Sequence, residues 1–322
     1  MHVLVTGGCG FIGSHIVERH LKKGDNVHVI DDLSTGNIQN NSAFTENPKF
    51  RLDEADILTW PDLDHAVAWA DRIYHMAAVV GVYRVLAEPI KVLTTNIPGC
   101  ERILRAAAAS SRRPRILLAS TSEVYGPFNG KPFEETDNLV VEFGAQNRWN
   151  YAISKIADEA FGLSYAGSLG LPITIIRFFN TVGPRQTGRY GMVLPRFVSQ
   201  AIRGQPITVY GDGNQRRCFC DVRDTVEILN LIAEAANSIG EIVNVGNNRE
   251  ISINDLAKLV LEMSNSKSPI QHISYEEAYG SPFLDIQRRV PNLEKLLSLT
   301  GFKHQWTLES TIEYLISNFH AD

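Results

Sequence analysis

Short apolar, β-branched runs alternate along the chain with longer segments whose apolar positions recur at helical spacing. The predicted strands are His2–Thr6, Asn26–Ile30, Arg72–His75, Arg115–Ser120 and Pro172–Phe178, with a return strand at Glu241–Val245. The predicted helices begin near Ile12 and run from about Lys91 to Ala109 and from about Tyr151 to Ser168. Strands separated by helices predict an α/β fold of the Rossmann type, a doubly wound parallel sheet covered on both faces.

After Asn180 this alternation loosens into segments rich in Gly, Pro and Arg, at Val182–Arg189 and Gly211–Arg217. We interpret this change as the entry into a smaller, discontinuous α/β domain. The predicted boundaries give residues 1–180 and 218–247 to the first domain, and 181–217 and 248–322 to the second. The tail from Ser252 is expected to contain two or three short helices.

Composition narrows the class of protein. The chain has 322 residues, 44% of them hydrophobic, and 31 Lys and Arg against 36 Asp and Glu give a net charge of -5, which argues against a nucleic-acid-binding protein. Apolar stretches are too short to cross a bilayer, and the first strand leaves no room for a leader, so we expect a cytoplasmic protein without membrane contact. The scattered Cys9, Cys100, Cys218 and Cys220 predict reduced thiols, no disulfide and no metal site.

A glycine-rich turn follows the first predicted strand, with Gly7, Gly10 and Gly13 each three positions apart and the helical pattern directly behind. Such a turn places bare backbone N–H groups and the positive end of a helix dipole against a pyrophosphate. Glycines also serve ordinary tight turns. Here the second strand ends at Asp31-Asp32, where a carboxylate can accept hydrogen bonds from an adenosine ribose. The sequence therefore predicts a dinucleotide site, and NAD rather than NADP, because the carboxylates would repel a 2′-phosphate.

Tyr151 and Lys155 lie four positions apart at the start of a predicted helix, and so on one face of it. That spacing alone means little, but Thr121-Ser122-Glu123 directly follows a predicted strand, where ligands bind in parallel sheets. A tyrosine with the ordinary pKa of about 10 acts as a base near neutrality only if its pKa falls by about three units. Lys155 and a nicotinamide charge are the expected causes. Taken singly, the Thr and Ser could be caps and the Lys a solvated residue.

In this order and spacing the residues resemble the extended short-chain dehydrogenase/reductase family, whose members act on nucleotide sugars. The resemblance covers nearly the whole chain and rests on Gly7, Gly10, Gly13, Asp31, Ala77-Ala78 after Tyr74-His75, Asn96, Thr121, Tyr151, Lys155 and Arg177-Phe178-Phe179-Asn180. It implies a tightly held NAD that removes a hydride from the sugar, usually at C4, and later returns it. The implied NAD contacts are Gly7, Gly10, Phe11, Ile12, Gly13, Asp31, Asp32, Asp56, Ile57, Ala77, Ala78, Asn96, Tyr151, Lys155 and Phe178. Asp56 can equally be a helix cap.

The second predicted domain then holds a UDP-sugar. In the segment Pro206–Arg217 a glycine turn presents arginines that could clamp a diphosphate, although they could also be plain surface charge. The resemblance implies that Thr208 to Tyr210 border the base. The implied substrate contacts are Tyr83, Arg84, Asn180, Val193, Thr208, Tyr210, Arg217 and Arg289.

The residues flanking Thr121 bear on the reaction. Many 4,6-dehydratases of this family carry Asp-Glu where this chain has Ser122-Glu123, and many 4-epimerases have no acid at the Glu123 position. Ser-Glu resembles the UDP-glucuronate decarboxylases, although GDP-mannose dehydratases carry it too. Asp285–Pro291 also resembles their Arg-Arg-x-Pro segment, in which Arg289 would face the C5 carboxylate of the sugar.

Arg148-Trp149-Asn150-Tyr151 resembles a further decarboxylase motif, whereas Ala78–Arg84 does not match these enzymes closely. We expect C4 oxidation, decarboxylation of a UDP-uronic acid, UDP-glucuronate first, and reduction to a UDP-pentose. The implied catalytic residues are Thr121, Ser122, Glu123, Tyr151, Lys155 and Arg289. The alternatives are a UDP-sugar 4-epimerase, a 4,6-dehydratase and a nucleotide-sensing module without chemistry. By analogy, we expect a homodimer formed by the helices at Lys91–Ala109 and Tyr151–Ser168.

Overall fold

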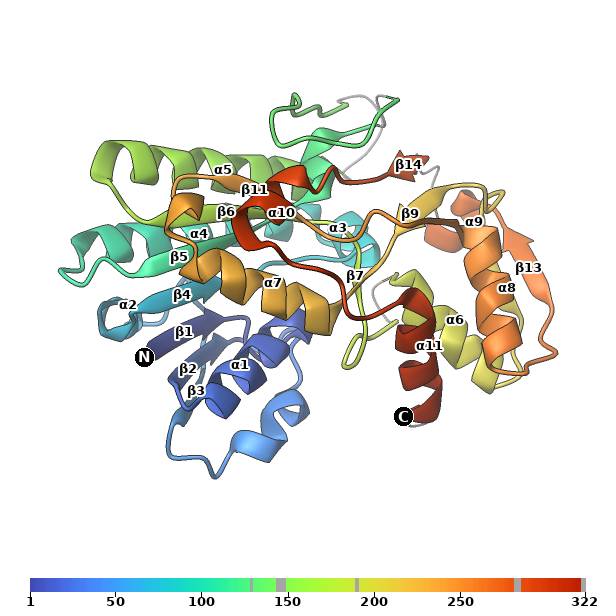
Figure 1. Ribbon diagram of the computed structural model, residues 1–322, viewed down its shortest axis with the longest axis horizontal. Helices are drawn as coiled ribbons and strands as arrows, with labels where there is room; N and C mark the ends of the chain where they lie inside the picture. The colour runs from blue at the N-terminus through green and yellow to red at the C-terminus, as the bar shows by residue number, and fades with distance from the viewer. Residues whose placement is uncertain (128–129, 143–148, 189–190, 281–284, 320–322) are drawn as a thin grey trace.

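The computed structural model describes residues 1–127, 130–142, 149–188, 191–280 and 285–319. A seven-stranded sheet in the order β11-β6-β5-β4-β1-β2-β3 forms the larger part of the molecule (Figure 1). Its strands are β1 (His2–Thr6), β2 (Asn26–Asp31), β3 (Phe50–Glu54), β4 (Arg72–His75), β5 (Arg115–Thr121), β6 (Ile173–Phe178) and β11 (Ile242–Val245). All of its pairings are parallel, which confirms the predicted doubly wound sheet. The chain order reverses between β1 and β4, and ligands bind at such a switch point.

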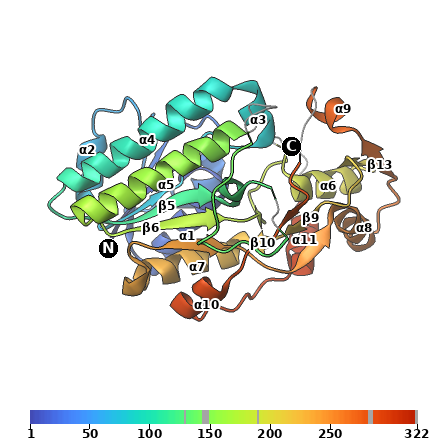
Figure 2. The ribbon, with the colours of Figure 1, turned by 90° about the horizontal axis from the view of Figure 1, so that it is seen from above.

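Helices cover both faces of this sheet, and its central strands are therefore almost continuously buried. One face carries α1 (Phe11–Lys23) and α7 (Val222–Glu234), and the other carries α2 (Leu63–Trp69), α4 (Pro89–Ala109) and α5 (Asn150–Leu169). Figure 2 shows α4 and α5 lying side by side. Apolar side chains from the sheet and each helix layer form two large core clusters, which hold the strand ends in place.

The smaller part lies beyond the carboxyl ends of these strands, at the right of Figure 1. It contains α6 (Val193–Ile202), β8 (Ile207–Tyr210), β9 (Arg216–Cys218), β12 (Glu250–Ser252), α8 (Ile253–Met263), β13 (Ile270–Ile273), α9 (Tyr275–Tyr279), β14 (Arg288–Arg289) and α11 (Leu308–Ser317). A separate apolar cluster joins α6, α8 and α11. Short segments connect or flank the two parts, among them α3 (Val82–Ala87), β7 (Thr181–Val182), β10 (Cys220–Asp221) and the 3₁₀ helices η1 (Ile38–Phe44), η2 (Ser122–Tyr125) and η4 (Ala236–Ser238).

The tail differs from the prediction. After Ser252 the described chain forms α8, α9, α10 (Glu294–Thr300) and α11, which is more than the two or three helices expected. Leu293 and Leu296 pack into the core that β1 and α7 share, so this stretch belongs by packing to the larger part. The sequence pattern could not place α10, because a helix with one apolar side does not indicate which neighbour it packs against.

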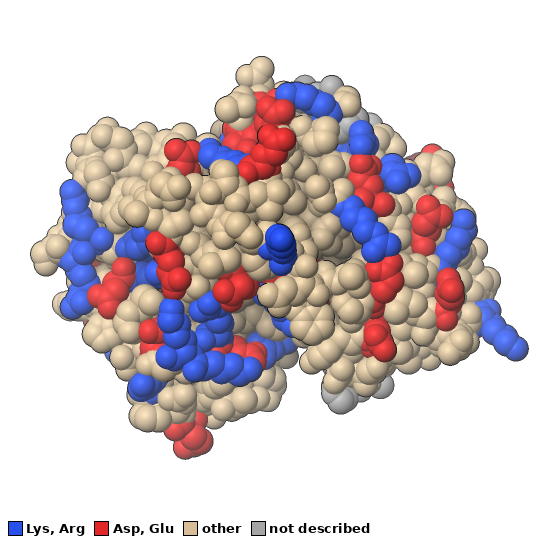
Figure 3. Space-filling view, viewed as in Figure 1, with Lys and Arg blue, Asp and Glu red and all other residues tan. Residues whose placement is uncertain are grey.

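A three-stranded sheet in the order β12-β9-β14 brings distant arginines together. Arg217 on β9 pairs in register with Arg289 on β14, although the two are far apart along the chain. On the face shown in Figure 3, acidic and basic side chains are interspersed rather than gathered into a patch of one sign. Within the described ranges, every helix is too short or too polar to span a bilayer.

Candidate active site

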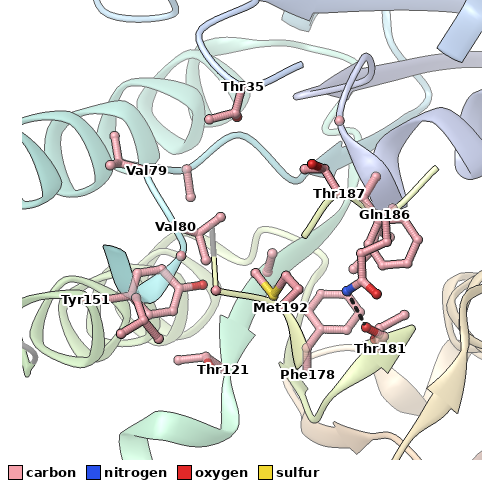
Figure 4. Close-up of a pocket in the computed structure, with 18 of the residues that line it drawn as sticks. Thr35, Val79, Val80, Thr121, Tyr151, Phe178, Thr181, Gln186, Thr187 and Met192 are labelled. Carbon is pink, nitrogen blue, oxygen red and sulfur yellow. Dashed lines mark hydrogen bonds between the residues drawn. The ribbon is translucent and has the colours of Figure 1, made fainter. Parts of the chain in front are cut away.

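A cavity of about 580 Å³ lies at the carboxyl ends of β1, β4, β5 and β6, and segments of the smaller part complete its walls (Figure 4). Most of the predicted site residues line this cavity. The exceptions are Asn96, Tyr83, Arg84 and Thr208. The sequence pattern and the geometry therefore point to one place, reached from both halves of the chain.

The glycine loop at the start of α1 is shaped by close backbone contacts. Gly7 has a φ of 71°, in the left-handed region that favours glycine, and a Cβ at Gly13 would lie 2.1 Å from the Gly7 carbonyl oxygen. Gly10 caps α1 without a side-chain hydrogen bond, and no acidic residue stands in the first turn. The first backbone N–H groups of α1 thus face the cavity beside Phe11 and Ile12, an arrangement that can hold a pyrophosphate.

Asp31 stands at the end of β2 against this loop. Its Oδ2 accepts a hydrogen bond from the Cys9 amide at 2.8 Å and its Oδ1 accepts one from the Leu33 amide at 2.9 Å. Burial raises the pKa of this carboxyl group. Each oxygen retains acceptor capacity for a ribose hydroxyl, and Asp31 also ties the glycine loop to β2. The neighbouring Asp32 is exposed and accepts from the Ser34 amide at 2.9 Å.

The remaining predicted cofactor contacts surround the same space. Asp56 and Ile57 line it, and Asp56 also caps its own turn by accepting from the Leu58 amide at 2.8 Å. Ala77 and Ala78 line it after β4.

Asn96 does not line the cavity. It is buried and bonds both backbone groups of Val79 and the Ser154 hydroxyl. Its geometry therefore supports the cavity wall rather than a direct ligand contact, a distinction that the sequence could not make.

Tyr151, Lys155 and Thr121 converge on the cavity from α5 and β5. In Figure 4 the Tyr151 hydroxyl points into the open space, with Thr121 below it and Val80 above. Thr121 and Phe178 are register partners across β5 and β6, and the Thr121 hydroxyl accepts from the Glu123 amide at 3.3 Å. The cavity thus brings a phenol, an ammonium group and a hydroxyl to one point.

The electrostatics of this group differ from the expectation. Burial raises the pKa of Tyr151 to about 12, although Lys155 lowers it. Burial alone would lower the pKa of Lys155, yet Asp158 raises it above its ordinary value. In the protein alone, desolvation therefore outweighs the lysine charge. A bound nicotinamide would add a positive charge beside the phenol and so lower the pKa of Tyr151 further.

Arg289, Glu123 and Ser122 line the cavity in the part where the sugar is expected, and Arg289 and Glu123 are in contact there. Arg289 Nη1 donates to Glu123 Oε1 at 3.4 Å and Nη2 donates to Asn180 Oδ1 at 3.0 Å. Arg289 Nε is buried and has no hydrogen-bond partner among the described residues. A buried guanidinium N–H without an acceptor is costly, and the arrangement suits an incoming anion.

Arg217 and Asn180, the predicted diphosphate contacts, already have partners within the protein. Arg217 Nη2 lies 2.9 Å from both carboxylate oxygens of Asp285, which also accepts from the Tyr275 hydroxyl at 3.0 Å. Asn180 Nδ2 donates to the Cys218 carbonyl at 3.2 Å. A ligand phosphate at this place would therefore meet an arginine whose charge Asp285 already neutralises. The sequence did not indicate that Asp285 is the partner of Arg217.

On the nucleotide side, Val193 and Tyr210 line the cavity. Tyr83 lies just behind the wall and shares a hydrogen bond of 2.7 Å with the Tyr210 hydroxyl. Thr208 does not line the cavity; its hydroxyl accepts a hydrogen bond from Gln200 Nε2, and its amide donates one to Gln200 Oε1. Arg84 pairs with Glu88 at 3.1 Å. Of these five predicted substrate contacts, Val193 and Tyr210 line the cavity, and the other three lie behind its wall.

Sequence reasoning missed several polar residues that line this space, among them Arg196 and Gln186. The Arg196 guanidinium lies 3.7 Å from the Tyr210 ring centroid, and its buried Nε and Nη1 have no partner among the described residues. Gln186 lies beside Phe178 in Figure 4 and donates to the Thr181 carbonyl at 2.9 Å, while its buried Oε1 has no described partner. Neither belongs to a motif recognisable by spacing, so only the fold could reveal them.

Two residues of the sequence motifs, Arg148 and Arg189, lie outside the described ranges. The four cysteines are free and buried. Among the residues with a described position, no group of three His, Cys, Asp or Glu side chains is arranged to hold a metal ion.

The fold and the cavity define an α/β protein that binds a dinucleotide beside a Tyr-Lys pair. Residues 3–246 match the NAD dependent epimerase/dehydratase family, and the chain belongs to that family. This membership confirms the predicted family, its enzyme class and NAD as the cofactor.

Several relatives cover nearly the whole chain. A UDP-N-acetyl-alpha-D-glucosaminuronate decarboxylase of Bacillus cytotoxicus is 36% identical over 98% of this chain and 97% of its own length. UDP-glucuronic acid decarboxylase 4 of Arabidopsis thaliana is 33% identical over 99% of this chain and 68% of its own length.

Solved structures agree on the fold. The UDP-glucuronic acid 4-epimerase of Bacillus cereus, with UDP-glucuronic acid and NAD, gives a TM-score of 0.86 at 26% identity over 99% of this chain and 100% of that one. The UDP-glucose 4-epimerase of Thermotoga maritima gives 0.88 at 26% identity over 98% of both chains. The two sequence relatives are thus named as decarboxylases, while both of these structural neighbours are 4-epimerases.

Proposed function

We propose that this protein is an NAD-dependent decarboxylase of a UDP-uronic acid, with UDP-glucuronate as its first candidate substrate and a UDP-pentose as its product. The observation that carries the proposal is the position of Arg289. Its guanidinium group lies beside Glu123 and Asn180, with one buried N–H that has no acceptor among the described residues. A planar, permanently charged fork suits a carboxylate, which a neutral sugar lacks.

The proposed mechanism assigns one task to each residue. Tyr151 removes the proton of the C4 hydroxyl, while Thr121 donates a hydrogen bond to the C4 oxygen. The glycine loop and Asp31 would hold NAD, which would supply the hydride acceptor for C4 oxidation and the hydride donor for its reversal. Lys155 holds the ribose beside the sugar and adds positive charge near the phenol.

The carboxylate end of the sugar is handled by different residues. A C4 ketone makes the C5 carboxylate a β-keto acid, so the bond to CO2 breaks and its electron pair passes into an enolate. Arg289 holds the carboxylate until it leaves. Glu123, 3.4 Å from Arg289, and the neighbouring Ser122 then lie near C5 and assist the delivery of a proton to C5 of the enolate, in the place of the lost CO2. Tyr151 and Thr121 thus act at C4 of the sugar, and Arg289, Glu123 and Ser122 act at C5.

The sequence relatives support this choice. Those reported above are named as decarboxylases of UDP-uronic acids, with and without an N-acetyl group. The relative from Bacillus cytotoxicus makes UDP-N-acetylglucosaminuronate the second candidate substrate. The 4-epimerase alternative is supported by the structural neighbours, and it would need the keto sugar to turn over within the cavity.

Product analysis separates these functions. The purified protein is incubated with UDP-glucuronate, UDP-N-acetylglucosaminuronate and UDP-glucose, and the nucleotide products are identified by chromatography and mass spectrometry. Loss of the mass of CO2 from a uronic acid is the expected result. Loss of water would indicate a dehydratase. An unchanged mass at a new retention time would indicate an epimerase, and either outcome would refute the proposed reaction.

We also propose that the enzyme is a cytoplasmic homodimer. The side chain of Ile90 on α4 is 76% exposed, and Leu163 and Leu169 on α5 are also exposed, so the paired helices offer apolar surface to a second copy. Light scattering after gel filtration tests the dimer. The domain boundaries stay as predicted, except that residues 293–302 are assigned to the NAD-binding domain because they pack in its core. The rest of the second region is proposed as the nucleotide-sugar-binding domain.

A further inference from the structure

The ammonium group of Lys155 has a partner that the mechanism above does not use. Lys155 Nζ donates to Asp158 Oδ2 at 3.0 Å, and the two side chains are only 2% and 1% exposed. Building on the proposed function, we infer that Asp158 is a positioning residue that holds Lys155 in place and, through it, sets the pH range in which Tyr151 works as a base. Asp158 touches neither the sugar nor the cofactor in this scheme, because it does not line the cavity.

The three residues follow one another along α5. Tyr151 and Lys155 are four positions apart, and Asp158 lies three positions further, so all three stand on one side of the helix. Helix α4 packs against α5 and helps to bury the pair. Lys155 carries three donors, and one of them is fixed by Asp158, which leaves two for a ribose hydroxyl and the phenol. The ion pair thus fixes the direction in which the remaining donors point.

The same ion pair reduces the field that Lys155 applies to Tyr151. A lone buried ammonium group would lower the pKa of a nearby phenol, whereas a paired one offers a partly cancelled charge. Burial raises the pKa of Tyr151 most and Lys155 lowers it, while the charges of Glu123 and Asp158 each raise it. Removal of the Asp158 charge should therefore lower the pKa of Tyr151, so that its phenolate is available as the base at lower pH, provided that Lys155 stays charged.

Other ionisable groups face this cluster from every side. Cys100 reaches it from α4 and His75 from β4, while Glu123 and Arg289 face Tyr151 across the cavity. Glu159 is adjacent on α5 but is paired with Arg177 at 2.7 Å. All of these groups remain when Asp158 is changed, so a shift between the parent and an Asp158 variant reports the Asp158 charge.

The test is Asp158→Asn, which keeps the shape of the side chain and removes its charge. We expect the acid limb of the pH profile for C4 oxidation, followed as reduction of NAD in a single turnover, to move to lower pH by about one unit. Asp158→Ser should move it in the same direction and serves if the first variant folds poorly. Asp62→Asn, at an exposed position before α2, is the matched control and should leave the limb in place.

A second measurement needs no substrate. The ultraviolet absorbance of tyrosinate is titrated in the NAD-bound protein, with a Tyr151→Phe version of each chain subtracted. The Tyr151 titration should also move to lower pH in Asp158→Asn. If the acid limb and the tyrosinate titration both stay in place or both move to higher pH, Asp158 is merely structural, whatever the loss of rate. That result would overturn the inference. If UDP-uronic acids are not decarboxylated while the tyrosinate titration still shifts, the proposed function fails and the role of Asp158 stands.

Discussion

The two sides of the cavity are built in different ways. On the cofactor side, the glycine loop and the ends of β1 and β2 form the site from backbone groups and from residues that are neighbours in sequence. On the substrate side, Arg289, Arg217 and Asn180 come from distant segments and are held by side-chain partners. We propose that the first side recognises its ligand by close fit to the main chain and the second by charge. An incoming anion would then share the arginines with Asp285 or Glu123.

The largest effect is expected where the two sides meet. Tyr151→Phe removes only the phenol oxygen, which points into the cavity in Figure 4. Loss of a general base should slow C4 oxidation by about a hundredfold to ten-thousandfold, measured as reduction of NAD after substrate addition. The melting temperature should stay near that of the parent. A variant that still reduced NAD at the parental rate would exclude Tyr151 as the base.

The close fit of the cofactor side predicts a severe effect from one methyl group. In Gly13→Ala the new Cβ would meet the Gly7 carbonyl oxygen, so the loop must open. We expect NAD affinity, measured by calorimetry, to fall by at least tenfold. Gly167→Ala is the matched control, because nothing lies within 4 Å of its Cβ and it stands in α5. It should be neutral or stabilise by about 0.5–1 kcal/mol. Equal NAD binding by both variants would contradict the close-fit account.

Charge recognition on the other side predicts an effect that depends on the substrate. Arg289→Ala should lower kcat/KM for UDP-glucuronate by roughly ten- to a hundredfold, the range for a lost charged hydrogen bond. Binding of UDP-glucose, which has no carboxylate, should change little. Arg289→Lys should recover only part of the activity, because it lacks the planar fork. Equal losses for both sugars would show that Arg289 has a general role only.

A smaller effect is expected at Asp31. Asp31→Asn keeps the shape but weakens the hydrogen bonds to a ribose and to the Cys9 and Leu33 amides, so NAD affinity should fall by about tenfold. Discrimination against NADP should fall with it. If the parent protein binds NADP as tightly as NAD in calorimetry, Asp31 does not select NAD over NADP.

The smallest effect concerns stability at acid pH, and it comes from buried histidines in the larger part, which carries the cofactor side. Burial lowers the pKa of His15 and His20 to about 4 and that of His75 to about 3, from a usual 6.5, and all three lie in the larger part. Below pH 6.5 the unfolded chain takes up protons that the folded chain does not, so stability should fall as the pH drops from about 6.5 to 4. His20→Gln should flatten this dependence of the melting temperature. His65→Gln, at a side chain that is 90% exposed, should not.

The same contrast decides what the sequence could predict. The strands, the glycine loop, Asp31 and the Tyr151-Lys155 pair are local patterns, and the structure has them where they were expected. Asp285 as the partner of Arg217, the buried acceptor of Gln186 and the packing of α10 depend on contacts between distant segments. Asn96 and Thr208 stand near the expected places, but their side chains turn to backbone and Gln200 instead of the cavity. Spacing identifies a neighbourhood, and side-chain direction requires the fold.

The most direct test of the central claim follows the carboxyl carbon itself. UDP-glucuronate labelled at that carbon is incubated with the NAD-bound protein, and released CO2 is measured against the nucleotide product, with Tyr151→Phe as the inactive control. The account predicts one labelled CO2 for each UDP-pentose formed, and none from the control. Label that stays entirely in the nucleotide sugar while its C4 configuration inverts would contradict the decarboxylase and identify an epimerase on the same fold.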